Sequence, residues 1–207
     1  AGVSPEDAGG AYNTRLDDRS DLAVEARRSA ALRRYAELRA IDTSQIPAGE
    51  RLTYDVLSAQ FQTAADGAQF SYGDFTPLNG IEPYVLNQLD SAFLTLPVLL
   101  DERHPVRTAA DAEAYIARLH AVAIAIDQET MRARADADRG VVPPLFIVDA
   151  TLALLDGVIA KAPSEQEYVT SFKRKLDALS AAVADPTQRA AADQRNLQFL
   201  TRAQIIV

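Results

Sequence analysis

Apolar residues recur at intervals of three and four along almost the whole chain, the spacing that places them on one face of an α-helix. The pattern is clearest in one segment, where the residues in register are Val169, Phe172, Leu176, Leu179 and Val183. No internal repeat or linker interrupts residues 18–207, and residues 1–17, rich in Gly, Asp and Ser, are expected to form a flexible lead-in. The sequence therefore predicts an all-α protein, an array of six to eight helices in a single domain over residues 18–207.

Capping residues and prolines mark where several of these helices should begin. Helical periodicity begins near Ser20, and the capping signals are Thr95, Thr108 with Asp111, Ser164 with Glu167, and Asp185 before Pro186. Between them, the spacing predicts helices from about 48 to 65, from 109 to 140 and from 145 to 159. Residues 85–103 are expected to form two short helices, with Pro97 in the first turn of the second.

Residues 66–84 break the helical pattern. They combine Gly67, Gly73, Gly80, Pro77 and Pro83 with Phe70, Tyr72, Phe75 and Tyr84. Because Phe70 and Tyr72 alternate like strand residues, the segment is predicted to be a long loop or a small hairpin. Long loops inside compact helical domains often carry function. The alternative is an aromatic plug that covers helix ends.

The predicted helix over 145–159 is the most apolar in the chain. Its apolar residues occupy nearly all faces, which predicts a central position in the bundle. Asp149 and Asp156 are its only acidic residues, and seven positions place them on one face, about 10.5 Å apart. They are candidates for lining a substrate cleft. The alternative is that they mark the one strip of this helix that meets water.

Composition excludes several classes of function. The chain has 21 Lys and Arg against 29 Asp and Glu, and a net charge of −8 disfavours nucleic acid or an anionic membrane as the main partner. Arginines gather between Arg27 and Arg39, but residues 15–51 hold eight Arg and seven Asp or Glu, so they are expected to form a solvated face. Without Cys there is no disulfide or thiolate site, and no apolar run approaches the ~18 residues of a membrane span.

The standard catalytic and nucleotide-binding motifs are missing from the chain. His104 and His120 lack the neighbouring ligands of a zinc site, so we expect His104 to abut a helix end and His120 to be a polar position on a long helix. Polar Asn87, Gln88 and Asp90 lie between apolar residues and must find hydrogen bonds, to the backbone or to a ligand. The residues alone thus predict no catalytic group and no metal ligand.

Four stretches together resemble a known family. They are PLNGIEPYVLNQLDSAFLTLP, HPVRTAADAEAYIARL, GVVPPLFIVDATLALLD and APSEQEYVTSFKRKL. In this order and spacing they resemble the bacterial "domain of unknown function 885" family, over about residues 41–207. One departure is Ser91, where the family usually has Gly.

The resemblance implies a largely helical, exported or lipid-anchored protein about three times this length. A His-Glu motif in its C-terminal half makes the family similar to zinc peptidases of the neurolysin and thermostable-carboxypeptidase group. The chain would then be the N-terminal, cleft-forming portion of a peptidase-like protein, inactive alone. Its partners would be the missing C-terminal portion and a peptide substrate. Zinc would belong to the full-length protein and no cofactor to this chain. Asn87, Gln88 and Asp90 would face the substrate channel.

Both ends of the chain fit this expectation. It starts without Met, as after removal of an export signal or at an artificial boundary, and it stops on the apolar residues Ile205, Ile206 and Val207 as if cut. A periplasmic or extracytoplasmic location is therefore expected. Two alternatives stay open: a self-contained exported helical binding or scaffold protein, and a free-standing hydrolase that uses Asp149 and Asp156.

Overall fold

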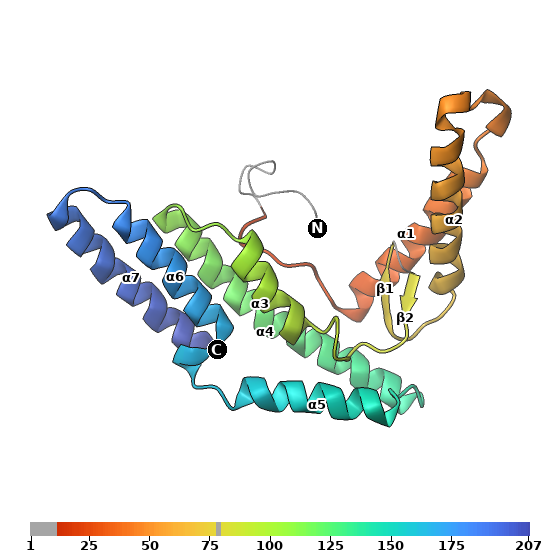
Figure 1. Ribbon diagram of the computed structural model, residues 1–207. Helices are drawn as coiled ribbons and strands as arrows, with labels where there is room; N and C mark the ends of the chain where they lie inside the picture. Colours follow the sequence, from red (N-terminus) through yellow and green to blue (C-terminus); the bar gives the residue numbers. More distant parts are fainter. Residues whose placement is uncertain (1–11, 78–79) are drawn as a thin grey trace. The chain divides into compact units, whose positions relative to one another are not determined.

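A computed structural model describes residues 12–77 and 80–207 of the chain. Within these residues it contains seven α-helices and one two-stranded hairpin (Figure 1). The helices are α1 (Asp21–Arg39), α2 (Arg51–Ala68), α3 (Ala92–Arg103), α4 (Ala109–Asp138), α5 (Leu145–Ile159), α6 (Glu167–Ala181) and α7 (Pro186–Ile206). Strands β1 (Asp74–Thr76) and β2 (Gly80–Glu82) pair antiparallel, and three short 3₁₀ turns cover Thr43–Gln45, Ala48–Glu50 and Pro163–Glu165. The predicted all-α array of six to eight helices, with a small hairpin within 66–84, is confirmed.

Three of the five helix starts predicted from Ser20 and the capping residues are correct. Ser20 and Asp185 each accept a hydrogen bond from a backbone N–H of the following first turn. Thr108 and Asp111 form a reciprocal capping box, because the Asp111 N–H donates to Thr108 Oγ1 at 3.1 Å and the Thr108 N–H donates to Asp111 Oδ2 at 2.9 Å. The other two starts are wrong: α6 begins at Glu167 itself, directly after a 3₁₀ turn, and Thr95 lies within α3.

The segment from 85 to 103 contains one helix, where two were predicted. Helix α3 begins at Ala92 and contains Pro97, which is buried in its interior. A proline here removes one backbone donor of the helix. Burial of Phe93, Leu96 and Leu100 on the same helix compensates for that loss, so the helix continues through the proline.

The chain divides into two compact units. Of the described residues, the first contains 12–17, 87–127 and 144–207, and the second contains 18–77, 80–86 and 128–143. Helix α4 is shared, since its residues up to Asp127 belong to the first unit and those from Gln128 to the second. Of the expected lead-in, residues 1–11 lie outside the described residues, while the carbonyls of Tyr12 and Arg15 accept hydrogen bonds from Arg118.

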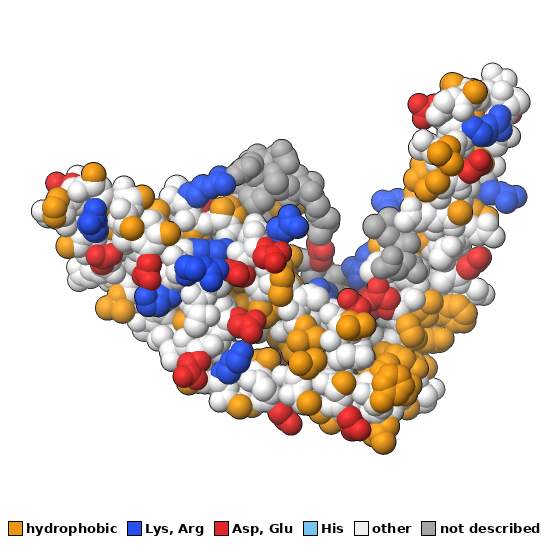
Figure 2. All heavy atoms as spheres, viewed as in Figure 1, with side chains coloured by type: hydrophobic (Ala, Val, Ile, Leu, Met, Phe, Trp, Pro, Cys, Tyr) orange, Lys and Arg blue, Asp and Glu red, His pale blue; other side chains and the backbone are white. Residues whose placement is uncertain are grey.

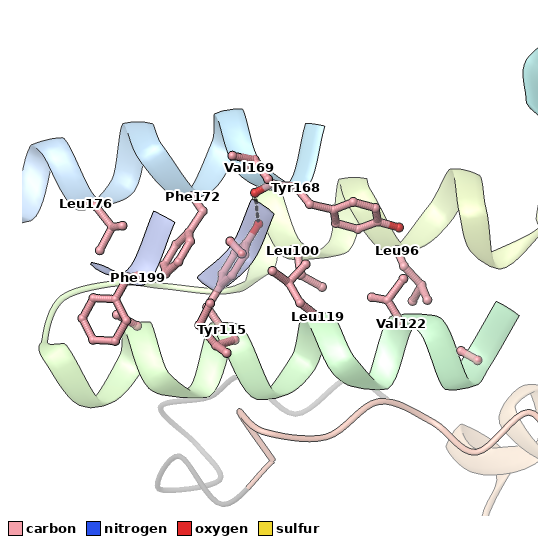
Figure 3. Packing of buried hydrophobic residues seen from close by; sticks show 14 of the residues in the cluster. Leu96, Leu100, Tyr115, Leu119, Val122, Tyr168, Val169, Phe172, Leu176 and Phe199 are labelled. Atoms are coloured by element: carbon pink, nitrogen blue, oxygen red, sulfur yellow. Dashed lines mark hydrogen bonds between the residues drawn. The ribbon is translucent and has the colours of Figure 1, made fainter. Parts of the chain in front are cut away.

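The core of the first unit lies between α3, the first part of α4, α6 and α7 (Figure 3). Tyr115 and Phe172 are fully buried there, with parallel rings whose centroids are 4.2 Å apart. The Tyr115 hydroxyl donates to the Tyr168 carbonyl at 2.8 Å, which satisfies the one polar atom of this buried ring. Leu100, Leu119 and Leu176 belong to the same cluster.

The core of the second unit is smaller and lies where the hairpin meets α1 and α2. Phe75 of β1 is 1% exposed and packs among Val24, Ala31 and Ala64. Gly67 allows the approach of β2 to α2, because a Cβ there would lie 2.7 Å from the Ile81 nitrogen. The aromatic segment thus supplies one residue that plugs the space between two helices.

Helix α5 contradicts the expectation that an apolar helix lies at the centre of a bundle. Thr151 is its one buried residue, whereas Leu145, Phe146 and Ile159 are 69–75% exposed. The helix forms where its apolar pattern predicts it, but the prediction that it lies at the centre of a bundle is wrong. None of the described helices is both long enough and apolar enough to cross a bilayer.

Candidate functional site

Asn87, Gln88 and Asp90 lie together in the turn that precedes α3. The Asn87 carboxamide oxygen accepts from the backbone N–H groups of Leu89 and Asp90 at 2.7 and 2.9 Å, which closes an Asx turn. The Asn87 N–H donates to Ser91 Oγ at 2.8 Å, and that hydroxyl donates back to the Asn87 carbonyl. Ser91 is fully buried, and its two hydrogen bonds to Asn87 stabilise this turn.

Gln88 differs from its neighbours because its side-chain oxygen Oε1 is buried and accepts no hydrogen bond. A buried amide oxygen without a donor costs free energy. The Asp90 carboxylate is exposed. The turn therefore contains one buried hydrogen-bond acceptor without a donor, Gln88 Oε1, and one exposed carboxylate, that of Asp90.

Asp149 and Asp156 both lie on α5 and are exposed to solvent. They are two helical turns apart, on the same side of the helix as the exposed Leu145 and Leu152. Two solvated carboxylates ~10.5 Å apart are too distant to share a proton.

The two histidines differ sharply. His104 ends α3 as its C-cap residue and is 1% exposed, whereas His120 is exposed on α4. His104 Nδ1 accepts from Arg118 at 3.0 Å, and Nε2 donates to the Asp111 carbonyl at 3.1 Å. Burial lowers the pKa of His104 to about 4, and the nearby cations of Arg118 and Lys175 act in the same direction. A neutral ring with both nitrogens engaged is a structural group, as expected from the sequence.

Lys175 lies close to the same place. Its ammonium group donates to the carbonyls of Leu100 and His104, which are orphan acceptors at the end of α3. Burial lowers the pKa of Lys175, whose side-chain nitrogen is held by these carbonyl oxygens. These contacts fasten α6 to α3.

A cluster of buried charges surrounds the turn at Gly73 in the second unit. The Gly73 N–H donates to Asp136 Oδ2 at 2.8 Å, and its carbonyl accepts from Arg132 at 2.8 Å. Arg132 also pairs with Asp74 at 3.0 Å, and Arg28 donates to the Tyr72 carbonyl at 2.8 Å. These side chains bind backbone atoms of the hairpin or one another. The cluster therefore fixes the turn.

Sequence reasoning missed this cluster, although a signal was present. Arg28 lies in register with Val24 and Ala31 on the apolar face of α1, and it is 3% exposed. The prediction of a solvated arginine face is thus wrong for Arg28, while Arg33 and Arg39 are exposed. A charge at a core-face position of a helix predicts a buried ion pair or a bound backbone carbonyl.

A pocket of about 330 Å³ opens between α7 and the first turn of α4. Its wall includes Phe199, Arg195 and the pair formed by Glu113 and Arg202, whose atoms are 2.8 and 2.9 Å apart. The hydrogen bond from Arg202 holds the pKa of Glu113 below its ordinary value, so this acid stays ionised at neutral pH. None of the five candidate residues from the sequence lines this pocket.

The described residues do not suit a zinc site. Among residues 12–77 and 80–207, no group of three or more His, Cys, Asp or Glu side chains is placed to hold a metal ion. Both nitrogens of His104 are engaged, and His120 is exposed without a second histidine beside it.

Comparisons with known proteins identify relatives of the whole chain. The model of the family described as "Bacterial protein of unknown function (DUF885)" matches residues 3–204. No curated protein sequence matches significantly. A solved structure, "The crystal structure of the putative lipoprotein from Colwellia psychrerythraea", is similar with a TM-score of 0.80 at 17% sequence identity. The similarity covers 99% of this chain and 33% of that one, so the chain spans about a third of the length of that protein.

Proposed function

The chain belongs to the DUF885 family of bacterial proteins, and from that premise we propose that it is the helical, cleft-forming portion of a larger exported peptidase-like protein. In this proposal, polypeptide beyond Val207 supplies the zinc ligands and the general base. The portion described here supplies one wall of the substrate cleft and is inactive alone.

One observation carries the proposal. Nearly all of this fold recurs in a chain three times as long, where it makes up 33% of the polypeptide. That ratio supports the interpretation of these helices as one part of a larger protein. The peptidase activity itself rests on the resemblance of four sequence stretches, and export is supported by the description of the structural relative as a lipoprotein.

The turn at 87–91 is our proposed contribution to the cleft. In this proposal the unpaired Oε1 of Gln88 accepts a hydrogen bond from a peptide N–H, and Asp90 adds an exposed acid two residues further along the same turn. Asp149 and Asp156 are both exposed on one side of α5, and they stay candidates for lining the cleft. Their separation of ~10.5 Å argues against a hydrolytic pair that shares a proton.

The test begins with the natural open reading frame. We expect it to continue past Val207 and to encode a His-Glu motif. The purified full-length protein should then contain about one zinc per chain and cleave peptides, while the 207-residue chain does neither. In the full-length protein, Gln88→Ala should raise KM several-fold with little change in kcat.

The control for Gln88 is Gln69→Ala, since Gln69 is exposed at the end of α2 in the second unit. A reading frame that stops at Val207 would contradict the proposal and favour the alternative of a self-contained helical binding or scaffold protein. Zinc held stoichiometrically by the 207-residue chain would contradict it equally.

A further inference from the structure

Helix α5 exposes more hydrophobic surface than is usual in a folded protein, where most large apolar side chains are buried. Leu145, Leu152 and Ile159 are 72%, 52% and 75% exposed on one side of the helix, and Phe146 and Leu154, at 69% and 41%, are exposed on other sides. Single exposed leucines are common, but a continuous apolar patch marks an interaction surface. Figure 2 shows hydrophobic side chains gathered at the surface along this helix, with acidic ones beside them.

The exposed residues follow a regular geometry. Leu145, Leu152 and Ile159 are seven residues apart, so they form one row along the helix. Asp149 and Asp156 lie about 40–60° around the helix axis from this row, at ~100° per residue. The helix contains no Lys or Arg. The surface is therefore an apolar row with two carboxylates along one side.

The helix also has little to hold it in place. Fifteen residues are marginal for an isolated helix in water, and α5 buries only Thr151. Gln166 fastens its end by donating to the carbonyls of Val158 and Lys161 at 2.9 and 3.3 Å. That contact satisfies backbone acceptors but covers none of the apolar row.

We propose that the row formed by Leu145, Leu152 and Ile159 is a docking surface for an amphipathic helix of the same polypeptide, outside residues 1–207. This inference rests on the proposed function, because it requires a longer chain. The occupying helix would present its own apolar row flanked by Arg or Lys, which would pair with Asp149 and Asp156.

Two observations favour this occupant over others. Two thirds of the structurally similar chain lies outside the shared fold, which provides ample polypeptide to cover α5. A lipid surface fits poorly, since membrane-binding helices carry Lys and Arg where α5 carries two acids. A second copy of α5 would bring carboxylates against carboxylates, which is unfavourable.

The absence of Cys from these 207 residues permits a direct test by single-cysteine labelling. Leu152→Cys and the control Leu22→Cys, at an 81% exposed position of α1, are each placed in the full-length gene product and in this chain. In this chain both thiols should react with a maleimide at similar rates. In the full-length protein the thiol at 152 should react ~30-fold or more slowly than the one at 22, as expected for a buried position.

Charge reversal tests the chemistry of the occupant. Asp149→Lys with Asp156→Lys should raise the labelling rate at position 152 about tenfold in the full-length protein, while the control Asp193→Lys on α7 should not. A bifunctional reagent at position 152 should link α5 to residues beyond 207. Equal labelling at 152 and 22, or a link to α5 of a second copy, overturns the inference while leaving the proposed function intact. A reading frame that ends at Val207 overturns both.

Discussion

His104 shows how burial and neighbouring cations select one protonation state of a residue. Its ring is 1% exposed, accepts from Arg118 and donates to the Asp111 carbonyl, so the neutral ring satisfies every contact. A second proton would replace the acceptor that Arg118 needs with a second positive charge. His104 thus joins the end of α3 to α4, and Arg118 extends the connection to the carbonyls of Tyr12 and Arg15.

The lowered pKa predicts that acid destabilises the fold through His104. In the folded chain the pKa is about 4, against an ordinary value near 6.5, so between these values the unfolded chain binds a proton that the folded chain does not. The free energy of unfolding should therefore fall as the pH drops from 6.5 towards 4, by up to ~3 kcal/mol, and His104 should add no further change below pH 4. Urea unfolding at half-unit steps of pH measures this slope.

Two glutamine variants separate this effect from other titrations. His104→Gln should remove most of the slope between pH 6.5 and 4.5, whereas His120→Gln, at the exposed histidine, should retain it. Equal slopes in both variants would show that His104 is protonated in the folded state.

Gly73 and Gly140 form a matched pair that separates two costs of adding a Cβ: the cost of positive φ and the cost of a steric clash. Both have positive φ, 69° and 82°, which alanine adopts at a cost of ~1 kcal/mol. At Gly73 a Cβ would also lie 2.2 Å from the Glu82 carbonyl oxygen, whereas at Gly140 nothing lies within 4 Å. Gly73→Ala should lower the free energy of unfolding by about 3 kcal/mol and Gly140→Ala by about 1. Equal losses in urea unfolding would mean that the contact at Gly73 is absent in solution.

At the scale of elements, α5 is the helix whose stability depends most on its own sequence. Gly157 lies in its interior with open space around the Cβ position. Gly157→Ala should therefore stabilise the helix by ~1 kcal/mol and slow amide exchange of α5 about fivefold. Gly49→Ala, also in open space but outside α5, should leave that exchange unchanged. Faster exchange in the Gly157 variant would show that this glycine makes a close contact.

Helix existence was predictable here because caps and periodicity are local properties. Ser20, Thr108 and Asp185 act through hydrogen bonds to residues three positions away, which a sequence displays directly. Pro97 misled the prediction, since its cost to α3 is outweighed by burial against distant residues. The position of α5 was not predictable either, because an apolar helix indicates that something covers it but not which polypeptide does.

The candidate sites likewise differ in whether their contacts are local in sequence or distant. The turn at Asn87 was found from the sequence, because polar residues embedded between apolar ones must form hydrogen bonds. The charges around Gly73 were missed, because their partners on the hairpin lie 44 or more positions away, as for Arg28 and the Tyr72 carbonyl. A register test, which asks whether a charge lies on the apolar face of its helix, would have identified Arg28 and also Glu129, Arg132 and Asp136.

At the scale of the whole molecule, the two units have cores of unequal size. In the described residues, the cluster of the first unit contains fifteen buried hydrophobic residues, such as Phe172, and that of the second contains four, including Phe75. The second unit compensates with the charges around Gly73, which are held by hydrogen bonds to the hairpin. Hydrophobic burial stabilises more per residue than paired charges do, so the second unit should open more readily.

Truncation of one phenylalanine in each core tests whether the units open separately. Phe75→Ala and Phe172→Ala each remove a fully buried ring and should cost 3–5 kcal/mol. We expect Phe75→Ala to accelerate amide exchange in α1, α2 and the hairpin by a hundredfold or more, while α6 and α7 keep their protection. Phe172→Ala should act in the reverse sense, on α3, α6 and α7. Exchange-coupled mass spectrometry at native pH measures both patterns. If either variant accelerates exchange equally in both units, the chain unfolds as one cooperative body, and helix α4, which runs through both, transmits the loss.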